Sequence, residues 1–180
     1  MAELQRLRPI TISSHAEWKT QLRELLQRSS PTAKVAFVGV GHPFRGDDYV
    51  GSFIVKQIRK ECSSESVGFF DAEYSVESII SKIVQFHARH VVFVDACEMN
   101  HEAGHIELIP LADTDYPFFT THGIPLKLLA KQFLQDAKVW VLGIQPAQME
   151  PGRGVTPRVY DAAVSISDSI VATVKEGCCR

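Results

Sequence analysis

The chain reads Val35-Ala36-Phe37-Val38-Gly39-Val40-Gly41-His42-Pro43-Phe44-Arg45-Gly46-Asp47-Asp48 over residues 35–48. An apolar strand, a glycine-punctuated loop and the start of a helix follow one another, which is the usual order around a phosphate cradle. A P-loop carries Lys after its second glycine, and here Asp47 and Asp48 stand there. The dinucleotide fingerprint also fails, because Phe44 occupies the place of its third glycine. Two carboxylates repel an anion, so the loop indicates a metal or a cationic substrate instead of a nucleotide.

From Lys34 onward, the pattern of apolar residues predicts alternating strands and helices. Residues 91–94 are continuously apolar, as expected of a strand covered on both faces, whereas residues 104–110 alternate and predict an antiparallel edge strand. We therefore expect an α/β fold, a three-layer α/β/α sandwich around a mostly parallel, five-stranded twisted sheet with one antiparallel edge strand. The expected strands cover residues 35–40, 67–72, 91–94, 104–110 and 139–144. One helix is expected to start near residue 48, and three more are expected at 76–84, 126–134 and 156–175.

Residues 1–33 are expected to be an N-terminal extension of a main domain at 34–180. Ser14 and Glu17 have the spacing of a capping box, which starts a helix. The apolar residues that follow lie on one helical face, namely Trp18, Leu22, Leu25 and Leu26. This amphipathic helix is expected to pack on the body, and the alternative is a helix that binds a partner.

The composition excludes several classes of protein. A net charge of −2 gives no reason to expect nucleic-acid binding, which normally needs a strongly basic face. No apolar run approaches the roughly 18 residues that span a bilayer, and residues 1–8 lack the apolar core of a signal peptide. The 4 cysteines have neither disulfide-framework nor zinc-ribbon spacing. A cytoplasmic protein with no membrane or nucleic-acid partner is expected, and nothing demands more than a monomer.

Polar side chains follow the expected strands at the edge where parallel sheets bind ligands. Asp48 follows the first strand, Asp95 closes the third, and His122 precedes a helix. We expect these three to meet and to leave coordination positions open, as a site for zinc, nickel, manganese or iron would. Two further polar residues, Glu73 and Gln145, follow the second and last strands.

Each of these residues also has a plainer interpretation. An aspartate after a strand often caps a helix, and Asp47 is the better capping candidate of the adjacent pair. His122 can equally be a cap or a solvent-exposed group. Glu73 is either a hydrogen-bond acceptor behind the ligands or a substrate contact.

Other groups of potential functional residues give weaker signals. Cys97, His101 and His105 are evenly spaced, but no helix is expected there to align them, so they do not predict a metal site. A Gly-x-Ser-x-Gly elbow is absent, and no cysteine has an obvious histidine partner. If the protein is a hydrolase, its nucleophile should be water, helped by a metal.

Four motifs together resemble the [NiFe]-hydrogenase maturation endopeptidases, and within them the hydrogenase 3 type. They are Gly39-Val40-Gly41 through Arg45-Gly46-Asp47-Asp48-Tyr49-Val50-Gly51, then Val94-Asp95-Ala96, Thr121-His122-Gly123-Ile124-Pro125-Leu126 and Leu142-Gly143-Ile144-Gln145-Pro146. The similarity covers roughly residues 35–171. Departures from the family's usual pattern are His42 in place of asparagine, Tyr49 in place of glycine, and a second strand that ends without a glycine turn.

The resemblance implies an α/β endopeptidase that removes the C-terminal extension of an immature hydrogenase large subunit after nickel has been inserted. Its three metal-contacting positions fall on Asp48, Asp95 and His122, which would carry both the catalytic and the metal-binding roles. The nickel comes with the precursor, and no nucleotide or organic cofactor is implied. The alternatives are a non-catalytic nickel-sensing maturation chaperone, a self-contained zinc metallopeptidase and an α/β nucleotide binder.

Overall fold

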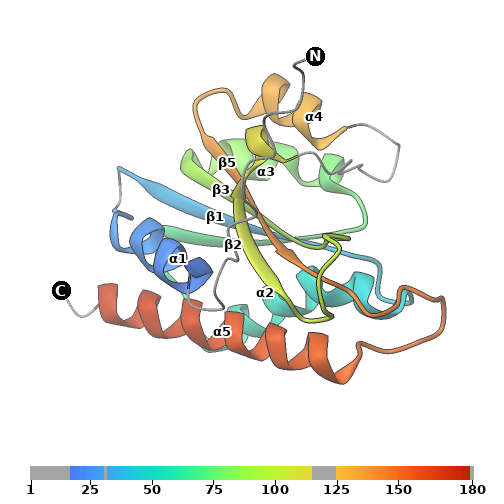
Figure 1. Cartoon of the computed structure of the whole chain (residues 1–180). Coiled ribbons are helices and arrows are strands. Elements are labelled where there is room, and N and C mark those ends of the chain that lie inside the picture. The colour runs from blue at the N-terminus through green and yellow to red at the C-terminus, as the bar shows by residue number, and fades with distance from the viewer. Residues whose placement is uncertain (1–16, 31, 115–124, 179–180) are drawn as a thin grey trace, which may run out of the picture.

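A computed structural model describes residues 17–30, 32–114 and 125–178 of the chain. At its centre lies a five-stranded sheet in the order β2-β1-β3-β5-β4 (Figure 1). The neighbours of β1 and β3 all run parallel, and only β4 is antiparallel, against β5. The strands are β1 Lys34–Val40, β2 Val67–Glu73, β3 Ala88–Ala96, β4 Ile106–Pro110 and β5 Lys138–Ile144.

Helices cover both faces of the sheet, so the predicted three-layer α/β/α fold is confirmed. In Figure 1 α1, α2 and α5 lie below the sheet, and α3 and α4 lie above it. Each face has its own hydrophobic core, with Phe37 and Val94 in the lower one and Val38 and Phe93 in the upper one. The helices are α1 Glu17–Gln27, α2 Val50–Glu61, α3 Ile80–Gln85, α4 Leu126–Phe133 and α5 Pro157–Cys178.

The strand order creates a crevice at one edge of the sheet. From β1 the chain crosses to β2 on one side, whereas β3 lies on the other side. Crossovers that leave in opposite directions open a gap beyond the carboxyl ends of β1 and β3, where ligands of such sheets bind. The residues that follow β1 and those that end β3 therefore share one edge of the molecule.

Two glycines allow helix α2 to approach this edge closely. A Cβ on Gly51 would lie 1.9 Å from the carbonyl oxygen of Val94 and 2.4 Å from that of Val40. Gly41 has a φ of +141°, and a Cβ there would lie 1.8 Å from the carbonyl oxygen of Asp48. The loop and the first turn of α2 are thus pressed onto the strand ends in a way that only glycine permits.

The helix expected in the N-terminal extension packs on the body. Its predicted stripe is buried against the lower core, with Trp18 3% and Leu22 1% exposed. An exposed ion pair of 3.4 Å joins Arg23 of α1 to Glu176 of α5. The capping residue Ser14 lies outside the described residues, and the division of the chain at residue 33 remains a prediction.

Two details of the helices differ from expectation. The segment predicted as one helix over 76–84 is a 3-10 turn, Val76–Ser78, followed by the short α3, because Ile79 has a φ of −117° that interrupts helical geometry. Only Val76 and Ile83 of that segment are buried, and Val84 is 40% exposed. In α4 Phe133 is 46% exposed, although its spacing places it next to the apolar stripe.

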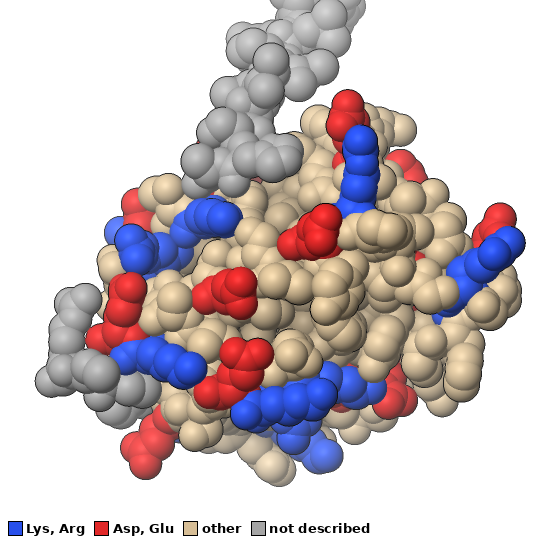
Figure 2. All heavy atoms as spheres, turned by 90° about the horizontal axis from the view of Figure 1, so that it is seen from below, with Lys and Arg blue, Asp and Glu red and all other residues tan. Residues whose placement is uncertain are grey.

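The surface of the lower layer mixes charges of both signs. Figure 2 shows this face with basic and acidic side chains interspersed and no field of a single sign. Among the described residues, no helix is both long and apolar enough to cross a bilayer.

Candidate functional site

Asp48 and Asp95 come from different elements and meet at the crevice beyond β1 and β3. Asp48 lies in a 3-10 turn, Gly46–Tyr49, which connects the glycine loop to α2. Its Oδ2 accepts a hydrogen bond of 2.8 Å from the backbone N–H of His42, which fixes the carboxylate against its own loop. Asp95 is the penultimate residue of β3, paired in register with Gly143 of β5. Both side chains are partly buried.

Both burial and the charge of Asp48 act on the carboxyl group of Asp95. Burial, together with the negative charge of Asp48, raises the pKa of Asp95 to about 8, against a smaller opposing effect of a hydrogen bond from the backbone of Ala96. Two carboxylates held together in a low-dielectric crevice keep a proton or recruit a cation. The crevice is therefore suited to a positive charge, as the glycine loop predicted.

Asp47 has a structural role that the sequence did not reveal. No side chain caps the turn or helix α2 among the described contacts, so the predicted capping role of Asp47 and its neighbour is wrong. Asp47 is fully buried, and its carboxylate accepts hydrogen bonds from the backbone N–H groups of Ala147 (2.8 Å), Gln148 (3.1 Å) and Thr156 (2.6 Å). The hydroxyl of Thr156 donates a fourth, of 3.0 Å. Asp47 thereby ties the β5–α5 connection to the glycine loop.

Gln145 has a comparable role on the other side of the crevice. Its side chain is 3% exposed, and its Oε1 accepts from the backbone N–H groups of Met99 (2.7 Å) and His101 (3.3 Å). Its Nε2 donates to the carboxylate of Glu98 at 2.7 Å. The loop after β3 is therefore held in place by Gln145, the residue that follows β5.

The fold recurs in solved structures. The [NiFe] hydrogenase maturation protease HycI of Thermococcus kodakarensis KOD1 is 22% identical, superposes with a TM-score of 0.76 and covers 86% of this chain and 99% of its own. A hydrogenase 3 maturation protease is 25% identical, with a TM-score of 0.69 and coverage of 77% and 90%. The endopeptidase HycI of Escherichia coli is 26% identical, with a TM-score of 0.66 and coverage of 75% and 87%.

The comparison of sequences agrees with these structures. A protein of Methanocaldococcus jannaschii, described as a hydrogenase maturation protease, is 24% identical over 131 residues, which are 68% of this chain and 78% of that protein. The chain is a homologue of the [NiFe]-hydrogenase maturation proteases. No protein-family model matches it.

Two of the three predicted ligands, Asp48 and Asp95, lie at the same edge of the sheet. The third, His122, lies outside the described residues, as do Thr121 and Gly123 of the same motif. The role of all three ligands thus remains a prediction.

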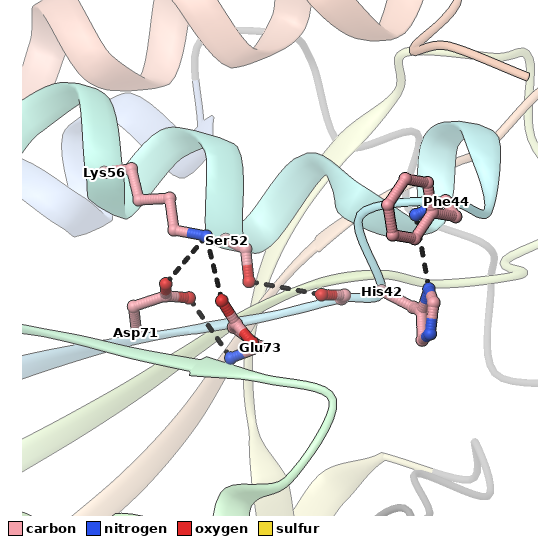
Figure 3. Close-up of polar contacts among 7 residues, drawn as sticks. His42, Phe44, Ser52, Lys56, Asp71 and Glu73 are labelled. Carbon is pink, nitrogen blue, oxygen red and sulfur yellow. Dashed lines mark hydrogen bonds and ion pairs between the residues drawn. The ribbon is translucent and has the colours of Figure 1, made fainter.

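Glu73 forms an ion pair with a lysine of helix α2. Lys56 of α2 reaches both Asp71 (3.0 Å) and Glu73 (3.3 Å) at the end of β2, and Figure 3 shows these contacts beside His42 and Phe44. Burial alone would lower the pKa of Lys56, but its hydrogen bond to Asp71 and the nearby negative charges raise the pKa above its usual value. Glu73 is half-exposed and has a φ of +48°, so it closes a turn that the ion pair stabilises.

Cys97 is not a nucleophile in this arrangement. Burial, followed by the charge of Asp95, raises the pKa of its thiol well above the usual value, against a backbone hydrogen bond from Ile144 that lowers it. A thiol that keeps its proton is a poor nucleophile and a poor metal ligand. No helix covers residues 97–105, as expected, yet His101 and His105 stack at 4.0 Å between ring centroids.

Proposed function

We propose that this chain is an endopeptidase that removes the C-terminal extension of a [NiFe]-hydrogenase large-subunit precursor after nickel insertion. The observation that carries the proposal is the meeting of Asp48 and Asp95 at the crevice of a family member. Two carboxylates, completed by the imidazole of His122, offer oxygen and nitrogen donors that suit a divalent first-row ion. The nickel presented by the precursor is then the recognition element, because a precursor without nickel lacks these contacts.

The raised pKa of Asp95 also gives this residue a candidate catalytic role. A carboxyl group with a pKa of about 8 can exchange a proton near neutral pH, as a general base or acid must. We assign Asp95 to proton transfer at the attacking water and Asp48 to orientation of the metal of the substrate. Asp48 is suited to orientation because the His42 N–H fixes its Oδ2.

Aromatic groups at the rim of the crevice suit an extended peptide. Phe44 is 70% and Tyr74 49% exposed, and the ring of His42 lies 5.1 Å from that of Tyr74 and 6.0 Å from that of Phe44. Figure 3 shows Phe44 and His42 on the loop that precedes helix α2. Exposed apolar groups that gather beside a polar crevice are typical of a protein-binding surface.

The decisive experiment mixes the purified protein with nickel-loaded and nickel-free precursor and measures the mass of the large subunit. We expect shortening of the nickel-loaded precursor only. Asp48→Asn, Asp95→Asn and His122→Ala should each slow cleavage by at least about 100-fold. The exposed Asp136→Asn is a matched control that should cleave like the wild type.

Other outcomes identify the competing functions. Binding of the nickel-loaded precursor without shortening would replace the protease with a nickel-sensing chaperone. Cleavage of generic peptides without any nickel in the substrate would indicate a self-contained metallopeptidase. Full cleavage by His122→Ala would remove that residue from the site.

A further inference from the structure

A second group of metal-ligand side chains gathers at the edge strand β4. The Nε2 of His105 lies 2.9 Å, and the Nε2 of His101 3.3 Å, from the same oxygen of Glu107, Oε1. One donor atom from each residue lies within 4.8 Å of the others, and this is the one such group found among the described residues. The two imidazoles stack with an interplanar angle of 20°, which brings their outer edges to the same carboxylate.

The backbone that carries these side chains is held in place. The N–H of His101 donates to the buried Oε1 of Gln145, and the carbonyl of His105 accepts from the Gln145 N–H at 2.9 Å. Glu107 lies on β4, paired with Gly143 of β5. All three donors are thus anchored to the end of β5, so a ligand would meet a largely preformed site.

The separations suit a single metal ion. Two ligands about 2.0–2.1 Å from one ion lie about 2.9–3.4 Å apart when the angle between them is right or tetrahedral. The two distances to the Glu107 oxygen fall in this range. Two imidazoles and a carboxylate form a donor set that zinc uses, with a position left for water. The side chain of His101 is 41% exposed, so an ion can enter from solvent.

This group is separate from the acidic pair at the crevice. Asp95 and Glu107 both pair with Gly143, from opposite sides of β5, so two strand spacings, about 10 Å, lie between them. The sulfur atoms of Cys97 and Met99 cover Gly143, 3.1 and 3.2 Å from where its Cβ would lie. The sulfur atoms of Cys97 and Met99 therefore lie between the acidic pair and the histidine group.

We propose that His101, His105 and Glu107 form a second site that binds a divalent transition-metal ion, zinc or nickel, and joins the loop after β3 to the edge strand. The site belongs to the protein itself and does not depend on the proposed protease activity.

The test uses the full chain, stripped of metal with a chelator, in an Asp48→Asn/Asp95→Asn background that disables the first site. Titration with zinc chloride followed by calorimetry should show one bound ion, and cobalt chloride should give the visible absorption bands of an imidazole-ligated ion. His101→Ala should weaken zinc binding by about 10- to 100-fold and abolish the cobalt bands. Glu107→Gln should weaken binding similarly, because an amide is a poorer ligand.

His87→Asn removes an exposed histidine elsewhere and should bind like its parent. Urea unfolding of the metal-free variants checks that each is folded, which is expected because His101 lies in an exposed loop. The proposal is overturned if the Asp48→Asn/Asp95→Asn protein binds no zinc, or if His101→Ala binds it as tightly as its parent. Either result would leave the cluster as a pair of histidine–carboxylate hydrogen bonds.

Discussion

Asp47 and Asp48 are adjacent in the chain, yet their carboxylates face different parts of the molecule. Asp47 points inward and accepts all four of its hydrogen bonds from residues 147–156, whereas Asp48 bonds to its own loop. Hydrogen bonds to a buried charge each stabilise by about 1.5–3 kcal/mol, and a buried donor left unpaired is costly. The position of the candidate ligand Asp48 therefore depends on its buried neighbour.

We expect Asp47→Asn to lower the free energy of unfolding by about 2–4 kcal/mol, because the amide NH₂ turns a donor toward groups that are themselves donors. Urea denaturation at pH 7 measures the change. Asp136→Asn, the same substitution on an exposed side chain, should change stability by less than about 0.5 kcal/mol. Equal stabilities of the two variants would show that the Asp47 contacts are not formed in solution.

At the scale of elements, helix α1 is attached through one apolar stripe. Leu22 is 1% exposed and packs in the lower core, whereas its neighbour Gln21 is exposed. Truncation of a buried leucine typically costs about 2–5 kcal/mol, because it removes contacts and leaves a cavity.

Leu22→Ala should therefore destabilise the protein by about 2–5 kcal/mol, and Gln21→Ala by less than about 0.5 kcal/mol. Thermal unfolding followed by circular dichroism distinguishes them. A neutral Leu22→Ala would mean that α1 is detached in solution and is free to bind a partner.

Periodicity was sufficient to predict most elements but not how loops meet. Continuous apolar runs such as Val91-Val92-Phe93-Val94 specified the strands, and the alternation at Ile106 and Leu108 specified the edge strand, because both patterns reflect burial directly. The interruption at Ile79 could not be predicted, since nothing in its side chain opposes a helix.

Contacts between distant loops were equally invisible in the sequence. Asp47 contacts residues about a hundred positions away, and His101 is held by Gln145, 44 positions away. The sequence could predict only that residues at the carboxyl ends of the parallel strands lie at the same edge of the sheet. Which carboxylate turns inward and which histidines stack depends on tertiary contacts that carry no local signature.

At the scale of the whole molecule, the fold buries Asp95 near the charge of Asp48 at one edge of the sheet, and this has a cost in stability. The pKa of Asp95 is about 8 in the folded protein, against an ordinary value of 3.8. Between these values the folded protein holds a proton that the unfolded chain has released. The free energy of unfolding should therefore fall as pH rises from about 4 to 8, by up to about 1.4 kcal/mol per pH unit from this group. The stability that the protonated Asp95 contributes is fully present below about pH 4 and is lost above about pH 8.

Asp95→Asn removes this titration and should leave a variant whose stability relative to the wild type grows steadily from pH 5 to pH 8. Urea denaturation in the presence of a chelator measures the difference in the free energy of unfolding between the variant and the wild type. The effects of all other titrating groups are the same in both proteins and cancel in this difference. Asp136→Asn should follow the wild-type curve at every pH. Parallel curves for Asp95→Asn and wild type would mean that the pKa of Asp95 is not raised in the folded protein. Acids that destabilise the fold at a ligand-binding edge are explained by a role in binding. A divalent cation that takes the place of the proton on Asp95 would restore the stability that is lost at high pH.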